Sequence, residues 1–203
     1  MKRVLICVTG MPGSGKSVVV EGIAEEFGYP VLSMGDVVRE EARRRGVKED
    51  LKSMMEFAKR LREEMGPTAV AELTSRRIRN VSSDVVVIDG VRSLDEIARF
   101  SKEGSVIIVA VHASPRTRFE RLVRRGRPDD PTDWEDFRER DLKELSFGIG
   151  GVIALADIMI VNEGRDISDI KKEAVSKLRE ELRNVFATGT KRSQTDRGSG
   201  ARA

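Results

Sequence analysis

The segment from residue 10 to residue 17 reads Gly10-Met11-Pro12-Gly13-Ser14-Gly15-Lys16-Ser17. It follows an apolar run, Arg3–Thr9, and a helical pattern begins inside it. The glycines allow a tight turn in which successive backbone N–H groups face inward and form a cradle for an anion. The start of a helix adds unpaired donors and the positive end of the helix dipole. The spacing matches G-x-x-x-x-G-K-[ST] between a strand and a helix, so it predicts a P-loop that binds a nucleoside triphosphate.

Two side chains of the predicted P-loop carry chemistry of their own. Lys16 is expected to reach the β and γ phosphates, and the Ser17 hydroxyl is expected to ligate Mg²⁺. We therefore expect all eight residues of the segment to bind the nucleotide, with Lys16 also catalytic and Mg²⁺ as a cofactor. A P-loop does not define the reaction, because GTPases, motor ATPases and small-molecule kinases share it.

The alternation of strands and helices sets the fold class. Runs rich in Val and Ile without polar alternation are typical of strands covered on both faces. Such runs are Arg3–Thr9, Pro30–Ser33, Asp84–Asp89, Ser105–Val111 and Asp157–Val161. Helical patterns cover Lys16–Phe27, Asp36–Arg45, Leu51–Met65, Thr68–Asn80, Ser93–Lys102, Ser114–Arg125, Asp133–Leu145 and Ser168–Asn184. The order predicts a three-layer α/β/α fold with a five-stranded parallel sheet, and the glycine-rich segment 148–151 is expected to be a turn.

The charge distribution argues against nucleic acid as the main partner. The chain has 37 basic and 34 acidic residues, a net charge of +3. Residues 187–203 hold four basic residues and one acidic residue, which leaves 33 of each sign in residues 1–186. This Gly-, Ser- and Thr-rich segment has almost nothing to bury and is predicted to be a disordered tail. Its four positive charges predict only weak contacts with nucleic acid in physiological salt.

Cysteine content and hydropathy predict the compartment. Cys7 is the single cysteine, so no disulfide can form within the chain. No apolar stretch approaches the length of a membrane span, and the first residues do not resemble a signal peptide. We therefore expect a cytoplasmic protein with no membrane partner.

Two further segments bring charged residues to the same edge of the predicted sheet. Residues 85–88 are apolar and Asp89 follows them, which is typical of a strand whose carboxylate orients Mg²⁺ or its water. Arg92 comes soon after, and its planar guanidinium suits bidentate capture of phosphate at the edge where open α/β folds bind ligands. Asp36 follows the second strand. It is either a helix N-cap or a general base for a hydroxyl acceptor.

Several of these segments resemble adenylate kinases. Residues 33–41, Ser-Met-Gly-Asp-Val-Val-Arg-Glu-Glu, resemble their acceptor-site segment, in which a Gly-Asp pair precedes a helix that carries a phosphate-binding arginine. By position this arginine is Arg39. Residues 89–92 resemble a shortened form of their Asp-Gly-x-x-Arg arrangement. The arginine-rich stretch 116–140 is similar to their mobile lid, whose charge closes on the transferring phosphate. The lid candidates are Arg121, Arg125 and Arg127.

A fourth segment resembles a different kinase. Residues 156–164 are similar to the Ala-Asp strand that ends in Asn in dephospho-coenzyme A kinases. In such kinases the following loop packs on the adenine ring, which implies nucleotide contacts for Asn162 and Gly164. An ordinary edge strand and turn is the alternative.

Over residues 3 to about 185 the chain is identified as a member of the adenylate-kinase-like superfamily of P-loop nucleotide kinases. It most resembles the adenylate-kinase-related and dephospho-coenzyme-A-kinase-related proteins. The resemblance implies one kinase domain, 1–186, with an acceptor-binding insert at about 34–80 and a lid at about 124–147. It also implies transfer of the terminal phosphate of Mg-ATP to a nucleoside monophosphate or a similar small phosphorylated acceptor.

The acceptor and the oligomeric state stay open. The Gly-Phe-Pro-Arg segment and the usual base-recognising segment of adenylate kinases are absent, and Met34 stands where those enzymes usually have Thr. One alternative is a kinase of a hydroxyl acceptor such as dephospho-coenzyme A. The other is a P-loop ATPase with a regulatory or RNA-associated role.

Overall fold

The computed structural model describes the backbone of residues 3–195 and the side chains as far as residue 187. Its centre is a parallel five-stranded sheet with the strand order β2-β3-β1-β4-β5. The strands are β1 (Arg3–Thr9), β2 (Val31–Ser33), β3 (Val85–Val91), β4 (Gly104–His112) and β5 (Ile158–Val161). The predicted α/β class and the five-stranded parallel sheet are confirmed.

The central strand β1 determines where the site forms. It pairs with β3 on one side and β4 on the other, so that Val4 lies opposite both Val85 and Ser105. All strands are parallel, and their carboxyl ends therefore meet at one edge. The chain leaves β1 at Thr9 and enters the P-loop between its two neighbouring strands. This is the switch point at which open α/β sheets bind ligands.

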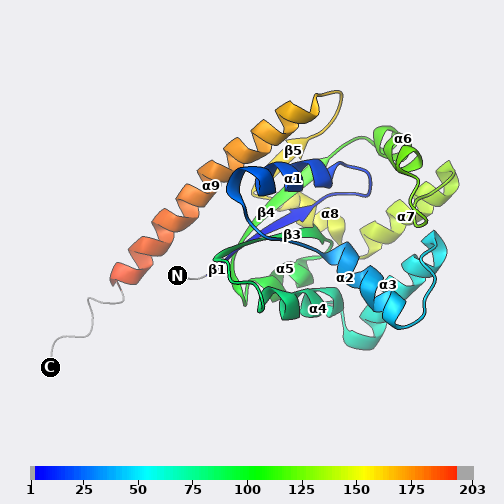
Figure 1. Cartoon of the computed structure of the whole chain (residues 1–203), viewed down its shortest axis with the longest axis horizontal. Coiled ribbons are helices and arrows are strands. Elements are labelled where there is room, and N and C mark those ends of the chain that lie inside the picture. The colour runs from blue at the N-terminus through cyan, green and yellow to red at the C-terminus, as the bar shows by residue number, and fades with distance from the viewer. Residues whose placement is uncertain (1–2, 196–203) are drawn as a thin grey trace.

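Helices cover both faces of the sheet (Figure 1). They are α1 (Lys16–Phe27), α2 (Met34–Arg44), α3 (Leu51–Met65), α4 (Ala69–Ile78), α5 (Leu94–Phe100), α6 (Pro115–Arg125), α7 (Trp134–Ser146), α8 (Ile149–Ala154) and α9 (Ile167–Thr195). Successive side chains of β1 point to opposite faces. Val4, Ile6 and Val8 pack in one cluster with α1 and α9, whereas Leu5 and Cys7 pack in the other.

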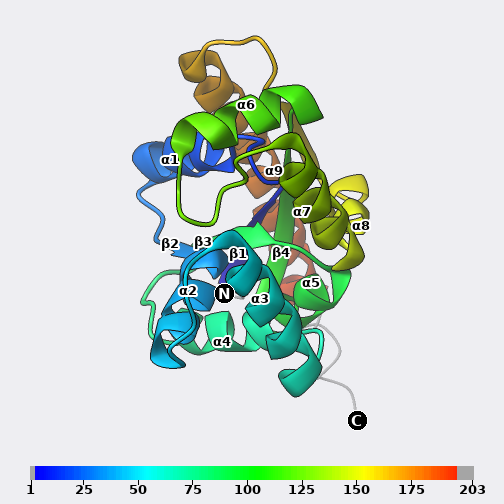
Figure 2. The same cartoon turned by 90° about the vertical axis from the view of Figure 1, so that its right-hand side faces the viewer.

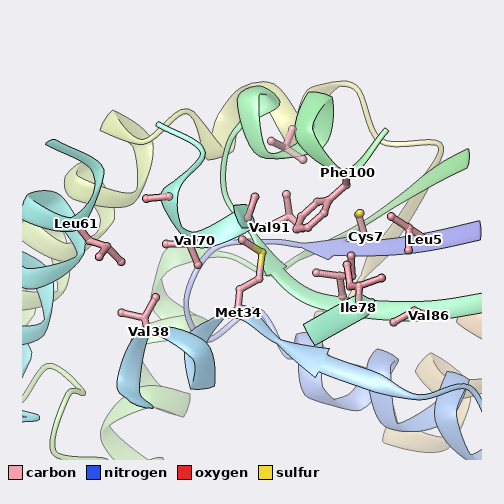
Figure 3. Close-up of a cluster of buried hydrophobic side chains, with 14 of the residues drawn as sticks. Leu5, Cys7, Met34, Val38, Leu61, Val70, Ile78, Val86, Val91 and Phe100 are labelled. Carbon is pink, nitrogen blue, oxygen red and sulfur yellow. The ribbon is translucent and has the colours of Figure 1, made fainter. Parts of the chain in front are cut away.

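The second cluster joins the helical insert to the sheet (Figure 3). Met34 and Val38 of α2 and Leu61 of α3 belong to the same buried cluster as Leu5 and Phe100. The insert is therefore packed onto the body of the protein by apolar contacts. The insert helices α2 and α3 and the helices α6 and α7 lie at the same end of the molecule in Figure 1, and this end faces the viewer in Figure 2.

The start of α2 differs from the prediction. The helix begins at Met34, and its N-cap is Ser33, whose Oγ accepts a hydrogen bond from the Asp36 N–H at 3.2 Å. Of the two alternatives for Asp36, helix N-cap or general base, the N-cap alternative is wrong. The extended backbone of Ser33 at the end of β2 is the geometry that a cap needs, and its hydroxyl reaches the first turn. The Asp36 carboxylate is thereby available for other contacts.

The glycine-rich segment 148–151 also differs from the prediction of a turn. Ile149–Ala154 forms the short helix α8, which starts after Gly148 at a φ of 99°. Ile149 and Val152 are buried. Burial of these two side chains outweighs the low helix propensity of Gly150 and Gly151.

The last helix extends further than expected. Helix α9 continues to Thr195, so the predicted disordered tail does not begin at residue 187. Extending an existing helix adds one backbone hydrogen bond per residue, and residues 187–195 contain no proline. The rest of the predicted tail, 196–203, lies outside the described residues. Over the described part of the chain, every helix is too short or too polar to cross a membrane.

The buried cluster between insert and sheet predicts a large cost for one substitution. Phe100→Ala removes a fully buried ring and is expected to lower the free energy of unfolding by about 3–5 kcal/mol. Guanidinium unfolding followed by circular dichroism measures this change. Leu155→Ala, at a side chain that is 63% exposed, is the control and should change stability by less than about 0.5 kcal/mol. Equal losses in the two variants would contradict the assignment of the core.

Candidate active site

A cavity of about 510 Å³ opens at the carboxyl edge of the sheet. It is lined by the P-loop, by the start of α2, by the end of β3, by α6 and the segment after it, and by the segment after β5. The structure brings together most of the predicted site side chains around this cavity. They are Lys16, Ser17, Asp36, Arg39, Asp89, Arg121, Arg125, Arg127 and Asn162.

Six predicted residues do not line this cavity: Gly10, Met11, Pro12 and Ser14 of the P-loop, Arg92 and Gly164. Arg92 does not line this cavity but a neighbouring one of about 60 Å³, which also contains Arg39, Arg140 and Glu144. Gly164 lines neither of these two cavities. Arg165 and Ile167 line the larger cavity, and the sequence analysis missed both. Arg165 follows Gly164 in the same loop and Ile167 begins α9, so the resemblance identified the neighbouring segment but not these residues.

The P-loop requires glycine for conformation and for space. Gly13 has a φ of 80° and Gly15 a φ of 91°, a region that other residues rarely adopt. A Cβ atom at Gly13 would lie 2.6 Å from the Arg118 carbonyl oxygen, and one at Gly15 would lie 2.0 Å from Asn162 Nδ2. Both positions therefore exclude a side chain.

Side chains from other elements hold the carbonyl groups of the P-loop. Asn162 Nδ2 donates to the Ser14 carbonyl at 3.0 Å, and Arg121 donates to Asn162 Oδ1 at 3.2 Å. Arg118 donates to the Pro12 carbonyl at 3.1 Å and pairs with Asp141 of α7. These donors bind the loop's carbonyls from outside, while within the loop the Ser14 N–H donates to the Met11 carbonyl at 3.1 Å. The amide of Asn162 thus supports the loop, and its predicted contact with adenine stays a prediction.

Lys16 is buried against the loop that contains it. Its Nζ donates to the Gly10 carbonyl at 2.7 Å and to the Met11 carbonyl at 3.4 Å. Burial lowers the pKa of Lys16 to about 8, although the nearby Asp89 carboxylate acts in the opposite direction. Phosphate oxygens would offer this ammonium group stronger acceptors than the two carbonyls do.

Asp89 and Ser17 fit a magnesium ion. Asp89 Oδ1 is buried and has no hydrogen-bond partner among the described residues. Burial raises the pKa of Asp89, and the positive charge of Lys16 partly offsets this effect. Mg²⁺ prefers oxygen ligands and keeps several waters, so it needs few protein ligands beside the phosphates. An unpaired carboxylate oxygen and a hydroxyl on the same cavity satisfy that requirement.

Arg39 lies where the two cavities meet, since it lines both of them. It donates a hydrogen bond to Asp36 at 2.7 Å, and its other terminal nitrogen lies 3.6 Å from the Asp129 carboxylate. Partial burial is the largest single effect and acts to raise the pKa of Asp36, but the hydrogen bonds from Arg39 and Ser33 and the nearby positive charges together lower it. Asp36 is therefore an ionised, weakly basic carboxylate.

Arg92 is held in place by two glutamates. Its Nε lies 2.6 Å from Glu144 Oε2, and its backbone N–H donates to Glu96 Oε2 at 2.7 Å. Glu96 is fully buried and also accepts from Arg62 at 3.1 Å. The negative charge of Glu144 raises the pKa of Arg92 despite its burial. Arg92 is thus a fixed cation at the wall of the smaller cavity.

The predicted lid carries its own counter-ions. Asp130 accepts hydrogen bonds from Arg125 at 2.8 Å, from the Arg127 N–H at 3.0 Å and from Arg140 at 3.2 Å. Burial is the largest single effect and acts to raise the pKa of Asp130, but the hydrogen bonds from Arg125 and the Arg127 N–H and the nearby positive charges together lower it. Arg121 points instead to the P-loop carbonyl of Ser14 at 3.4 Å. The three predicted lid arginines therefore have different surroundings.

Several charged residues around the site were not among the individual residues predicted to bind or to catalyse. Their partners are distant in the chain, and only the fold brings them together. The two acidic residues between prolines at 128–131 were the available signal for the lid. The residues are Glu96, Arg118, Asp129, Asp130, Arg140, Asp141 and Glu144.

Fold and site together define a P-loop protein with kinase-like α/β architecture. A family model described as AAA domain matches residues 9–138. A UPF0200 protein of Hyperthermus butylicus is 61% identical over 161 residues, which span 79% of this chain and 86% of that protein. A UPF0200 protein of Thermococcus kodakarensis is 51% identical over 185 residues, which span 86% of this chain and 100% of that protein. The chain therefore belongs to the AAA domain family by its P-loop region and to the UPF0200 family over most of its length.

Solved structures share the fold at low sequence identity. TT1252 from Thermus thermophilus superposes with a TM-score of 0.63 at 18% identity, over 90% of this chain and 99% of that chain. A gluconokinase from Sinorhizobium meliloti gives 0.54 at 20% identity, over 92% and 98% of the two chains. A shikimate kinase from Bacteroides thetaiotaomicron gives 0.54 at 20% identity, over 89% and 98%. These similarities concern the fold alone.

The lowered pKa of Lys16 predicts a pH dependence of nucleotide binding. In the free protein Lys16 loses its proton near pH 8, whereas bound phosphates would raise its pKa again. Binding then takes up a proton, so affinity for Mg-ATP should fall as pH rises above about 8, by up to tenfold per pH unit. Calorimetry between about pH 7.5 and 9.5 measures it. Lys16→Arg, whose side chain stays charged, should bind with affinity that is nearly independent of pH.

The hydrogen bond from Asn162 predicts a coupled loss of stability and nucleotide binding. Asn162→Ala leaves the buried Ser14 carbonyl without its amide donor, which is expected to cost about 1–3 kcal/mol of stability. Nucleotide affinity should fall about tenfold or more, because the loop loses a support. Thermal unfolding and calorimetry measure the two effects. Asn80→Ala, at an exposed residue after α4, is the control. Unchanged nucleotide affinity in Asn162→Ala would refute the supporting role.

Proposed function

We propose that this protein transfers the terminal phosphate of Mg-ATP to a small phosphorylated acceptor. The observation that carries this proposal is the position of Arg39, which lines both the P-loop cavity and the smaller cavity beside it. A donor site and an acceptor site that share a wall can align two phosphates for direct transfer. A protein that only hydrolysed ATP would not need the second site.

The larger cavity supports the donor half of the proposal. Its volume of about 510 Å³ lies in the range of small-molecule sites, which is about 300–1,000 Å³. The P-loop and Lys16 line one side, and Arg165 and Ile167 line it after β5. The polyphosphate would bind at the P-loop, which leaves the part of the cavity near Arg165 and Ile167 for the nucleoside.

The charges of the smaller cavity support a phosphorylated acceptor. Arg39, Arg92 and Arg140 all line it, and each forms an ion pair with a carboxylate. Guanidinium groups bind phosphate through paired hydrogen bonds, and a group of three is more than a neutral hydroxyl acceptor needs. An entering phosphate would take the place of a carboxylate such as Asp129.

The chemistry that follows is alignment and charge stabilisation. An acceptor phosphate is already an anion, so it attacks without a general base. Lys16 and the P-loop N–H groups would hold the transferring phosphoryl group, and Arg39 would hold the acceptor beside it. Arg121, Arg125 and Arg127 line the same cavity and would stabilise charge that spreads over the transferring group. A magnesium ion bound at Ser17 and Asp89 would supply further charge neutralisation.

A hydroxyl acceptor is the second candidate. Asp36 lines the donor cavity as an ionised carboxylate, which is the group that would accept a hydroxyl proton. The fold is also shared with proteins named gluconokinase and shikimate kinase. The hydrogen bond from Arg39 weakens Asp36 as a base, however, so we favour a phosphorylated acceptor.

Two substitutions separate these candidates. Arg39→Ala is expected to lower kcat/KM for the acceptor by about a hundredfold or more, which corresponds to about 2.7 kcal/mol. Asp36→Asn should cost less than about tenfold, because no proton is removed from a phosphate acceptor. A coupled assay of ADP release with Mg-ATP, across nucleoside monophosphates, dephospho-coenzyme A and simple organic phosphates, measures both.

The control for these variants is Arg43→Ala, at an exposed arginine of the same helix. The reverse result, in which Asp36→Asn abolishes turnover while nucleotide binding survives, would favour a hydroxyl acceptor. Steady ATP hydrolysis that no acceptor accelerates would refute the kinase proposal and favour a P-loop ATPase.

A further inference from the structure

The smaller cavity has two chemically different walls. One part of the lining is charged and holds the guanidinium groups of Arg39, Arg92 and Arg140 together with Lys143. The apolar wall comes from α2, α3 and the residue that follows α7. Its side chains are Val38, Leu51, Met54, Met55, Ala58 and Phe147.

The lining side chains offer little with which to recognise a nucleobase. Among the described residues that line the cavity there is no Ser, Thr, Asn, Gln, His or Tyr. The carboxylates are already engaged, Glu144 with Arg92, and Asp129 with Arg39 and Arg140. A base enclosed against the apolar wall would leave polar edge groups without partners, which is costly in a buried site.

The volume of the cavity limits the organic part of the acceptor. It measures about 60 Å³, whereas the donor cavity measures about 510 Å³. The smaller cavity is partly open to solvent, so a nucleoside bound there would extend out of it, whereas a short hydrocarbon group fits inside.

The apolar wall is backed by the core and cannot widen easily. Val38 and Met54 belong to the buried cluster that also contains Phe57 and Leu61 (Figure 3). Displacing them would disturb packing between the insert and the sheet, and packed interiors resist such changes. Met55 is partly exposed, and as an unbranched side chain it can adapt to a ligand.

We propose that the acceptor is a small organic phosphate whose other part is a short apolar group of about four or five carbons, and not a nucleoside. The phosphate binds between Arg39 and Arg140, where Asp129 lies now at 3.6 and 3.9 Å from the two guanidinium groups. The hydrocarbon group lies against the wall formed by α2 and α3. This inference rests on the proposed phosphotransfer and narrows its acceptor.

A panel of phosphates with matched charge tests the inference. We compare n-butyl and isopentyl phosphate with methyl phosphate, AMP and CMP, using Mg-ATP and the full chain. Phosphorus NMR follows transfer, and calorimetry measures binding in the presence of a non-hydrolysable ATP analogue. The kcat/KM values of the butyl and isopentyl compounds are expected to exceed those of the other three compounds at least tenfold. Only these two compounds cover the apolar wall without burying unpaired polar groups.

Two methionine variants test whether the preference for alkyl phosphates comes from the smaller cavity. Met55→Gln introduces a polar group of similar length at the wall, and the ratio of kcat/KM for butyl phosphate to that for methyl phosphate should fall at least fivefold. Met65→Gln is the matched control on the same helix. Met65 is 39% exposed and does not line the cavity, so the ratio should not change.

The outcomes distinguish this inference from the proposed function. Turnover of AMP or CMP in preference to the alkyl phosphates would overturn the inference and leave phosphotransfer intact. Binding of butyl phosphate that Arg39→Ala abolishes, without transfer to any compound, would support the ligand class and refute the kinase proposal. Failure of every alkyl phosphate to bind, or an unchanged preference in Met55→Gln, would overturn the inference.

Discussion

The structure depends on hydrogen bonds from other parts of the chain that hold the carbonyl groups of the P-loop. Asn162 after β5 and Arg118 of α6 donate to P-loop carbonyls, and Lys16 does so from within the loop. Asp141 of α7 pairs with Arg118 and so extends this support to the helix that follows the lid. The anion cradle is therefore not a property of eight residues alone. Three separate parts of the chain must fold correctly before the loop can present its donors.

Ion pairs hold the arginines of the smaller cavity in place in a similar way. Each arginine at the smaller cavity lies against a carboxylate, and Glu96 fixes the backbone of Arg92 from a fully buried position. Pairing makes it possible to bury these guanidinium groups, because an isolated charge in the interior would be far more costly than a matched pair. The arginines are consequently held at defined positions before any substrate arrives. An acceptor phosphate that binds as proposed would exchange one anion for another.

The sequence predicted the parts of the site that depend on local pattern. The P-loop was recognisable because its chemistry lies in eight consecutive residues, and Asp89 because it follows four apolar residues of a strand. Strand alternation was sufficient to predict the sheet. The roles of Asn162 and Glu144 were not predictable in this way. Each depends on a partner more than fifty residues away, and no local pattern records such a pairing.

The errors have the same origin. Helix α8 forms in a glycine-rich segment because Ile149 and Val152 become buried, which is a property of the fold and not of the segment. Asp36 and Ser33 are both good cap residues, and the choice between them follows from where β2 ends. The separation of Arg92 from the larger cavity likewise follows from its pairing with Glu144.

The position of Asp129 between Arg39 and Arg140 affects which ions of the cell can bind in the smaller cavity. Because the Asp129 carboxylate already neutralises the two arginines, chloride and other monovalent ions gain little free energy by binding in the smaller cavity. To replace Asp129, a ligand must carry more negative charge than one carboxylate. It must also have a shape that allows both guanidinium groups to bind it. The smaller cavity therefore selects ligands by their charge. Binding of the proposed acceptor should be much less sensitive to ionic strength than binding to an unpaired basic patch would be.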